Sequence, residues 1–201
     1  MARQGPVQHG RLTVAIVGDG QTEQIYFNDL KETDRPKNLD IFPTLPRTIG
    51  NYRGVLERAE ELVVAYDKVF ALIDMDKVIH DNQQIAYVKA KDAAVAKGVV
   101  VLENNPCFEM WLLLHFVFTS KLFDDCDGVS VKLKEHINGY KKSERFIIAA
   151  RLYSKYRDKI KDSAISNARK LDNNRAGQDK LYPRAEVFKF FEWYTDQMLK
   201  S

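Results

Sequence analysis

Two aspartates separated by one residue, Asp74 and Asp76, follow an apolar run at 69–73. An apolar run that ends in charged residues is typical of a buried strand, and parallel α/β sheets bind ligands where their strands end. Two carboxylates about 4 Å apart repel each other by about 4 kcal/mol at an effective dielectric constant near 20. A hard divalent cation would offset that repulsion, so the pair predicts a magnesium site. The alternative is that the pair only begins a solvated loop.

Four strands that alternate with three helices are predicted before residue 106. The expected strands are 12–17, 39–45, 68–73 and 98–102, and the expected helices are 22–32, 52–66 and 80–97. This alternation predicts an α/β fold with a four-stranded, mainly parallel sheet and crossover helices on its faces. Because the carboxyl ends of parallel strands share one edge, we expect Asp19, Asp74, Asp76 and Glu103 to gather there.

Helices dominate the pattern from Asn105 onward. The Asn105-Pro106 pair is typical of a helix start, with proline as the first helical residue, and the residues that follow are apolar on nearly every side. Further helices are expected at 130–137, 143–160, 163–171 and 184–200. We therefore expect an α/β metal-binding core at 1–127 and a helical extension at 128–201 that packs on the core as one unit.

Composition places the chain among folded globular proteins, because 45% of its 201 residues are hydrophobic. Residues 1–11 lack an apolar signal segment, and the longest apolar block, 110–118, is too short to span a bilayer. We expect a cytoplasmic protein without membrane contact. The two cysteines, Cys107 and Cys126, fit neither a disulfide framework nor a zinc-ligand spacing, so we expect two free thiols.

Charge is divided along the chain. Residues 1–127 hold 14 Lys and Arg against 19 Asp and Glu, whereas residues 128–201 hold 17 against 9. A basic extension is expected to attract a polyanion, most often nucleic acid, although basic residues also simply solvate helices. The candidate phosphate contacts are Lys132, Lys134, Lys141, Lys142, Arg151, Lys155 and Arg157, with Tyr140, Tyr153 and Tyr156 as candidate stacking surfaces.

Three motifs give the chain a resemblance to a known family. They are Val-Gly-Asp-Gly-Gln-Thr-Glu-Gln-Ile-Tyr-Phe at 17–27, Leu-Ile-Asp-Met-Asp at 72–76 and Asn-Pro-Cys-Phe-Glu-Met-Trp-Leu-Leu-Leu-His-Phe at 105–116. Together with the closing segments 164–171 and 182–187, they resemble the RloB-like family over nearly the whole chain. The first and third motifs are the most specific, because neither arises readily from composition alone.

This resemblance implies a Toprim-like fold, the metal-binding α/β module of topoisomerases, primases and certain nucleases, and an association with restriction and phage-defence loci. In the family pattern a glutamate after the first strand acts as general acid or base, and an Asp-x-Asp after the third strand binds Mg²⁺. Asp74 and Asp76 match the pair. Asp19 stands where the family usually has glutamate, and its shorter side chain could instead bind the metal through water. Glu23 could supply the longer arm or simply compensate the helix N-terminus.

Glu109 and His115 lie in the third motif. Glu109 falls in the first turn of the expected helix, where the helix dipole alone favours a carboxylate, so its roles as a site residue and as a structural residue both remain open. His115 follows six residues later, which places the two side chains about 120° apart around the helix axis. We therefore expect His115 to be a buried histidine with a hydrogen-bond partner rather than a partner of Glu109.

The sequence favours a nuclease or related phosphoryl-transfer enzyme that uses Mg²⁺ or Mn²⁺ on RNA or DNA in bacterial phage defence. Asp74, Asp76 and Asp19 are the expected metal ligands, and Asp19, Glu23 and Glu109 the expected catalytic groups. No P-loop is present, so an ATP-driven step would need a separate ATPase partner protein. The alternatives are a non-catalytic effector module that binds nucleic acid or a protein partner, and a binder of nucleotides or small phosphates.

Overall fold

Five strands form one sheet in the computed structural model, which describes residues 10–174 and 182–200. The strands are β1 (Leu12–Val17), β2 (Leu39–Thr44), β3 (Lys68–Asp74), β4 (Val100–Asn105) and β5 (Arg184–Ala185). Their order is β2-β1-β3-β4-β5, with β1 to β4 parallel and β5 antiparallel to β4. The predicted α/β fold with its parallel strands is confirmed, and β5 is an addition that the sequence pattern did not predict.

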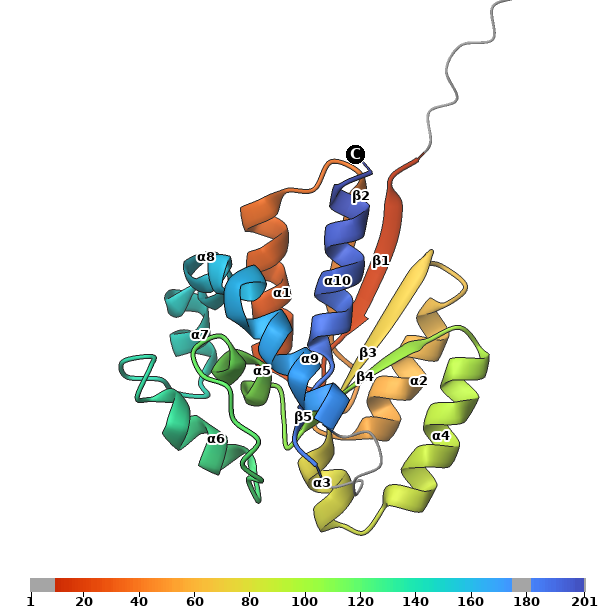
Figure 1. The fold of residues 1–201 in the computed structure, drawn as a ribbon. Helices are drawn as coiled ribbons and strands as arrows, with labels where there is room; N and C mark the ends of the chain where they lie inside the picture. Colours follow the sequence, from red (N-terminus) through yellow and green to blue (C-terminus); the bar gives the residue numbers. More distant parts are fainter. Residues whose placement is uncertain (1–9, 175–181, 201) are drawn as a thin grey trace, which may run out of the picture.

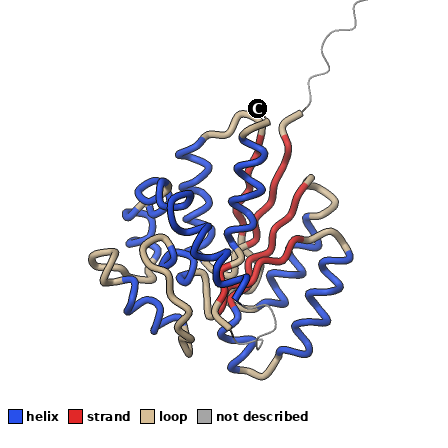
Figure 2. The backbone as a smooth tube through the Cα atoms, in the orientation of Figure 1, coloured by secondary structure: helices blue, strands red, loops and turns tan. Residues whose placement is uncertain are grey.

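Helices cover both faces of the sheet (Figure 1). They are α1 (Gln21–Asp34), α2 (Tyr52–Leu62), α3 (Met75–His80), α4 (Gln84–Ala96), α5 (Glu109–Leu114), α6 (Cys126–Leu133), α7 (Glu144–Ala150), α8 (Leu152–Tyr156), the π-helix η1 (Ile160–Ala164), α9 (Ile165–Asn174) and α10 (Val187–Met198). Helices α1 and α10 lie on one face and α2 and α4 on the other (Figure 2). None of the helices in the described ranges is long and apolar enough to cross a membrane.

Alternation along the strands divides the apolar residues between two cores. Val14 and Ile16 of β1 belong to the core beneath α1 and α10, whereas Ala15 and Val17 belong to the core beneath α2 and α4. Successive side chains of a strand point to opposite faces, so a fully apolar strand is what a sheet covered on both faces requires. The first core draws residues from both predicted parts of the chain, including Phe27 from α1 and the aromatic residues of α10.

Several predicted helices differ from the structure. The helix expected to begin at Pro106 begins at Glu109, because the Pro106 carbonyl instead accepts hydrogen bonds from the amides of Met75 and Asp76. The helix expected over 80–97 begins at Gln84 as α4, and the separate short helix α3, which was not predicted, ends at His80. The helix expected over 130–137 lies four residues earlier as α6, and the first two residues of the helix expected over 184–200 form β5 instead. The helix expected over 143–160 is interrupted at Arg151, whose φ of 45° lies in the left-handed region and separates α7 from α8.

Substitution of Phe190 tests how far the stability of the first core depends on α10. Its ring packs edge-on against Phe27 of α1 and Phe70 of β3, with ring centroids 5.0 and 5.2 Å apart. We expect Phe190→Ala to lower the free energy of unfolding by about 3–5 kcal/mol, as measured by urea denaturation. Phe42→Ala is the matched control, because Phe42 is 41% exposed, and it should cost under about 1 kcal/mol. Equal losses in the two variants would contradict the packing described here.

Candidate functional site

Asp74 ends β3 at the carboxyl edge of the sheet. Its Oδ1 accepts a hydrogen bond of 2.9 Å from the Phe108 amide, and its neighbour in register on β4 is Asn104. The amides of Met75 and Asp76 donate to the Pro106 carbonyl at 2.9 and 3.0 Å. The segment between β4 and α5 therefore fixes both the Asp74 carboxylate and the chain that leaves β3.

The turn from β1 into α1 brings Asp19 and Glu23 to the same edge. Glu23 lies in the first turn of α1 and is buried. A Cβ atom at Gly18 would lie 2.8 Å from the Glu23 Cβ, closer than real side chains approach, so a glycine is needed where β1 ends. Close approach of the strand to the helix is what positions the Glu23 carboxylate inside the protein.

Glu109 reaches the same region from α5. Its side chain is fully buried. The Tyr140 hydroxyl donates to it at 3.1 Å, and the Lys142 ammonium lies 3.1 Å from one of its oxygens. The positive charge of Lys142 also acts to lower the pKa of Asp19, Glu23 and Asp74, against the larger upward effect of burial. We call Asp19, Glu23, Asp74 and Glu109 the carboxylate cluster.

Burial makes Asp19, Glu23 and Asp74 hard to ionise. It raises the pKa of Glu23 to about 8, with further upward contributions from the charges of Glu109 and Asp19. It also raises the pKa of Asp74 well above its usual range, assisted by Glu23 and Asp19. Burial raises the pKa of Asp19 to about 6, where the charge of Asp76 adds to the effect and Lys77 opposes it. Several anions thus share a region with too little positive charge, the situation that a bound cation relieves.

Lys142 shows the complementary shift. Burial alone would lower its pKa, but the charges of Glu109, Asp74 and Glu23 outweigh this and raise it above the usual range. From the sequence, Lys142 was predicted only to contact phosphate. No local signal identifies it as the ion-pair partner of Glu109, because 33 residues separate the two in the chain.

Asp76 sits apart from the buried carboxylates, in the first turn of α3. It is half-buried, and one of its oxygens accepts from the Lys77 amide at 2.6 Å. A small cavity of about 90 Å³ opens at the carboxyl edge, and Asp76 is not among the residues that line it. The cavity is lined by Asp19, Gly50, Asn51, Tyr52, Asp74, Lys77, Val78, Asp81 and Gln83.

The residues fit a hard divalent cation. Asp19 Oδ1 is buried and has no hydrogen-bond partner in the part of the chain that the structure describes, so its lone pairs are available to a cation. The surrounding donors are carboxylate oxygens, which Mg²⁺ and Mn²⁺ prefer. The cavity that contains Asp19 and Asp74 has room for an ion and a few waters.

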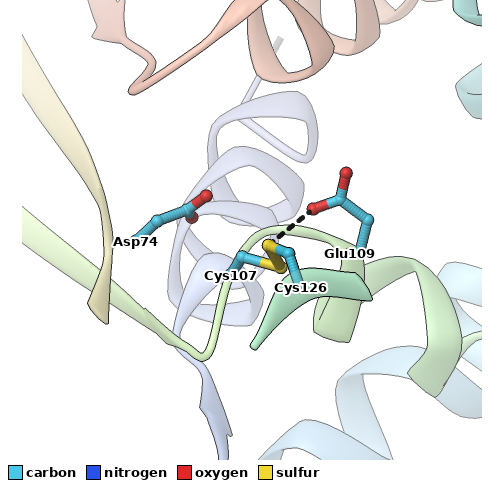
Figure 3. A group of neighbouring side chains, drawn as sticks. All are labelled: Asp74, Cys107, Glu109 and Cys126. Atoms are coloured by element: carbon cyan, nitrogen blue, oxygen red, sulfur yellow. Dashed lines mark hydrogen bonds between the residues drawn. A yellow bond between two sulfur atoms is a disulfide. The ribbon is translucent and has the colours of Figure 1, made fainter. Parts of the chain in front are cut away.

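The prediction of two free thiols is wrong. Cys107, between β4 and α5, and Cys126, the first residue of α6, form a disulfide. Spacing could not reveal this, because the cysteines are 19 residues apart and meet only through tertiary packing. Figure 3 shows the disulfide between the Asp74 and Glu109 side chains. Among the described residues, these four form the one set of three or more potential metal-binding side chains whose ligand atoms all lie within 4.8 Å of one another.

Glu103 belongs to a different part of the molecule. It pairs in register with Ile73, one residue before Asp74, and therefore faces the opposite side of the sheet. Its carboxylate forms ion pairs with Arg184 and with Lys91, the latter at 2.7 Å. Burial opposes its ionisation, but these two cations outweigh that effect and lower its pKa. The expectation that Glu103 might join the edge cluster is not what the structure shows.

His115 is buried, as expected, and lies away from Glu109. Its Nδ1 is 2.9 Å from the Trp111 carbonyl oxygen, so Nδ1 carries the proton in this contact. Burial lowers the pKa of His115 to about 4, and the imidazole is therefore neutral at neutral pH. These observations describe a structural histidine.

Several of the candidate phosphate contacts are engaged within the protein. Lys132 pairs with Glu135 at 2.6 Å, Arg151 with Asp29 at 2.6 Å, and Arg157 lies 3.5 Å from Asp34. Lys155 lies over the Tyr156 ring. Lys134 and Lys141 are exposed, and neither has a carboxylate partner within 4.0 Å in the described ranges. Of the three candidate stacking tyrosines, Tyr140 and Tyr153 are buried in the core and cannot stack on a base.

Comparison with known proteins gave one match. A family model described as RloB-like protein covers residues 14–193, which include most of β1, all of β2 to β5 and all the members of the carboxylate cluster. Neither a curated protein nor a solved structure matches the chain.

Substitution of Gly18 tests the close approach between the end of β1 and Glu23. We expect Gly18→Ala to lower the free energy of unfolding by about 1–3 kcal/mol, because the added methyl group forces Glu23 and α1 to shift. Gly10→Ala is the control, since a Cβ at Gly10 meets no atom within 4 Å. Urea denaturation of the two variants measures the difference. A neutral Gly18→Ala would contradict the contact.

Glu23 makes stability depend on pH. Its pKa is about 8 in the folded protein and 4.5 ordinarily, so in the metal-free protein its contribution is fully present below about pH 4.5 and is lost as pH rises through about 8. Glu23→Gln cannot ionise, and each pKa unit corresponds to about 1.4 kcal/mol. We therefore expect the variant to gain stability over the parent protein progressively across this pH window.

Denaturation in the presence of a chelator, repeated at several pH values, measures this gain. Glu57→Gln is the control, because Glu57 is exposed on α2. Parallel pH profiles for the parent and Glu23→Gln would show that Glu23 is not held in its protonated form.

Proposed function

This chain belongs to the RloB-like family, and from that premise we propose that it is a Mg²⁺-dependent nuclease, or a related phosphoryl-transfer enzyme, with a Toprim-like fold. The observation that carries the proposal is the carboxylate cluster, in which burial raises the pKa values of Glu23 and Asp74. Buried acids at the carboxyl edge of a parallel sheet are characteristic of a site that functions with a cation. The role in phage defence rests on the family resemblance.

Asp74 and Asp76 would hold the ion, with Asp19 as a third ligand. The Toprim-like assignment is supported by the place of the first two residues, because Asp74 ends the third strand of the chain and Asp76 follows in the first turn of α3. Asp19 is supported by its buried, unpartnered oxygen. Mg²⁺, or Mn²⁺ in its place, would supply positive charge against the phosphate that reacts.

Glu23 is the best placed proton carrier. A general base works best when its pKa is near the working pH, and the pKa of Glu23 is raised to about 8. Asp19 is the second candidate, with a pKa raised to about 6. Glu109 is the third candidate catalytic group. Tyr140 and Lys142 contact its carboxylate and hold it beside the other acids.

The substrate would be RNA or DNA, held through its phosphates. Lys134 and Lys141 are exposed and lie close to Lys142 in the sequence. They are the candidate residues best able to contact the phosphates of a nucleic acid. Any step driven by ATP would need a separate ATPase partner, since the sequence has no P-loop.

A non-catalytic effector module is the second candidate. Asp19 favours it, because an aspartate stands where the family resemblance leads one to expect a longer glutamate. The engagement of Arg151 and Arg157 with acids of α1 also reduces the basic surface available to a substrate. Such a module would bind the cation and nucleic acid or a protein without cleaving a phosphodiester.

Cleavage of mixed RNA and DNA under Mg²⁺ titration tests the proposal. We expect cleavage that requires Mg²⁺ or Mn²⁺ and that falls at least about a hundredfold in Asp74→Asn, since losing a ligand should exceed the effect of losing its supporting contacts. Asp92→Asn is the matched control, because Asp92 is exposed on α4 and is not a member of the carboxylate cluster.

Thermal unfolding in the same titration separates the two candidates. A cation that binds the folded state raises its stability with concentration. Stabilisation by Mg²⁺ without cleavage would support the effector module. Undiminished cleavage in Asp74→Asn would refute the assignment of the metal site.

A further inference from the structure

The disulfide lies inside the site rather than on the outer surface. Cys107 is fully buried, and Cys126 is half-buried at the start of α6. Sγ of Cys126 is 3.6 Å from Glu109 Oε2 and 3.6 Å from the Lys142 ammonium. A disulfide sulfur has no proton to donate, so its contact with Glu109 is not a hydrogen bond.

Reduction of the disulfide would change the ability of these side chains to bind a metal ion. A disulfide sulfur is a poor metal ligand, whereas two thiolates beside two carboxylates are a strong ligand set for a thiophilic divalent ion. Cys107, Cys126, Asp74 and Glu109 already have ligand atoms within 4.8 Å of one another. Tetrahedral ligands on zinc are separated by about 3.3–3.8 Å, given bond lengths of about 2.0–2.3 Å, so small side-chain movements would suffice.

We propose that reduction of the Cys107–Cys126 disulfide creates a second divalent-metal site, in which both thiolates together with Asp74 and Glu109 bind Zn²⁺ or a similar thiophilic ion. This site is chemically distinct from the all-oxygen Mg²⁺ site, although the two share Asp74. The proposal does not rest on the nuclease activity, because it concerns metal binding alone.

The surroundings of the four residues suit a bound ion. Two thiolates and two carboxylates carry more negative charge than a divalent ion neutralises, and the Lys142 ammonium is in contact with both Glu109 and Cys126. Glu109 also accepts from Tyr140, and Asp74 accepts from the Phe108 amide. Hydrogen bonds of this kind orient the ligating carboxylates in protein metal sites.

The chemical steps balance. A trialkylphosphine attacks one sulfur, and the half-buried Cys126 is the accessible one; water then converts the phosphonium to phosphine oxide and leaves two thiols. The phosphine loses two electrons, and the disulfide gains two electrons and two protons. When the divalent ion binds, the two thiols release those protons to solvent.

Cobalt absorption tests the proposal directly. The protein is reduced with a trialkylphosphine, freed of it without exposure to air, and titrated with Co²⁺. We expect a thiolate-to-cobalt charge-transfer band in the near ultraviolet and intense visible bands typical of tetrahedral Co²⁺, both abolished by Zn²⁺. The chain has two cysteines in all, so a charge-transfer band must come from Cys107 or Cys126.

Oxidised protein is the first control and needs no substitution. It should show no charge-transfer band. If reduced protein, with its thiols confirmed by titration, shows none either, the proposal is overturned, whether or not the variants below fold.

Single substitutions then identify the oxygen ligands. Asp74→Asn and Glu109→Gln should each weaken Co²⁺ binding by at least about tenfold. Asp92→Asn is the matched control, because Asp92 is exposed on α4 and lies outside the set, so its loss should leave the cobalt spectrum and affinity unchanged. Unchanged affinity in both Asp74→Asn and Glu109→Gln would overturn the four-ligand site. The cobalt spectrum does not depend on cleavage of nucleic acid, so failure of either proposal can be recognised separately.

Discussion

Repulsion among buried carboxylates is the constraint on which the site depends. Asp19, Glu23 and Asp74 come from the ends of β1 and β3, and burial raises the pKa of each. Protonation, the Lys142 ammonium and a bound cation are the three ways in which this repulsion can be relieved. A divalent cation carries more positive charge than either of the other two supplies, which is the reason for proposing that this site binds one. Glu109 joins the group by the same logic, since its burial is tolerated through its contact with Lys142.

The uneven charge of the two chain halves is largely resolved inside the molecule. Basic residues of the second half neutralise acids of the first, as Lys142 does for Glu109, Arg151 for Asp29 and Arg184 for Glu103. A charge count therefore overstated the surface left for a polyanion. Ion pairs that link distant segments also bind the helical extension to the sheet, in addition to the apolar core that both halves share.

What the sequence could and could not predict follows from the range of each interaction. Apolar runs and their alternation depend on neighbouring residues, so the four parallel strands and the place of Asp74 at a strand end were predictable. Glu103 was expected to follow a strand that ends at residue 102, but β4 continues to Asn105. Glu103 therefore lies within the strand, where alternation places its side chain on the face opposite that of Asp74. The disulfide and the Lys142 contact depend on packing between distant segments. No spacing within the sequence records either one.

Helix α10 has a consequence for how the protein is made. It covers the sheet face that Phe27 and Phe70 help to form, and it is synthesised after every other helix in the described chain. Until residues 187–198 leave the ribosome, that aromatic face lacks the cover of α10, and exposed apolar surface of this kind favours aggregation. The stability of the sheet face near β1 and β3 therefore depends on a segment more than a hundred residues away in the sequence.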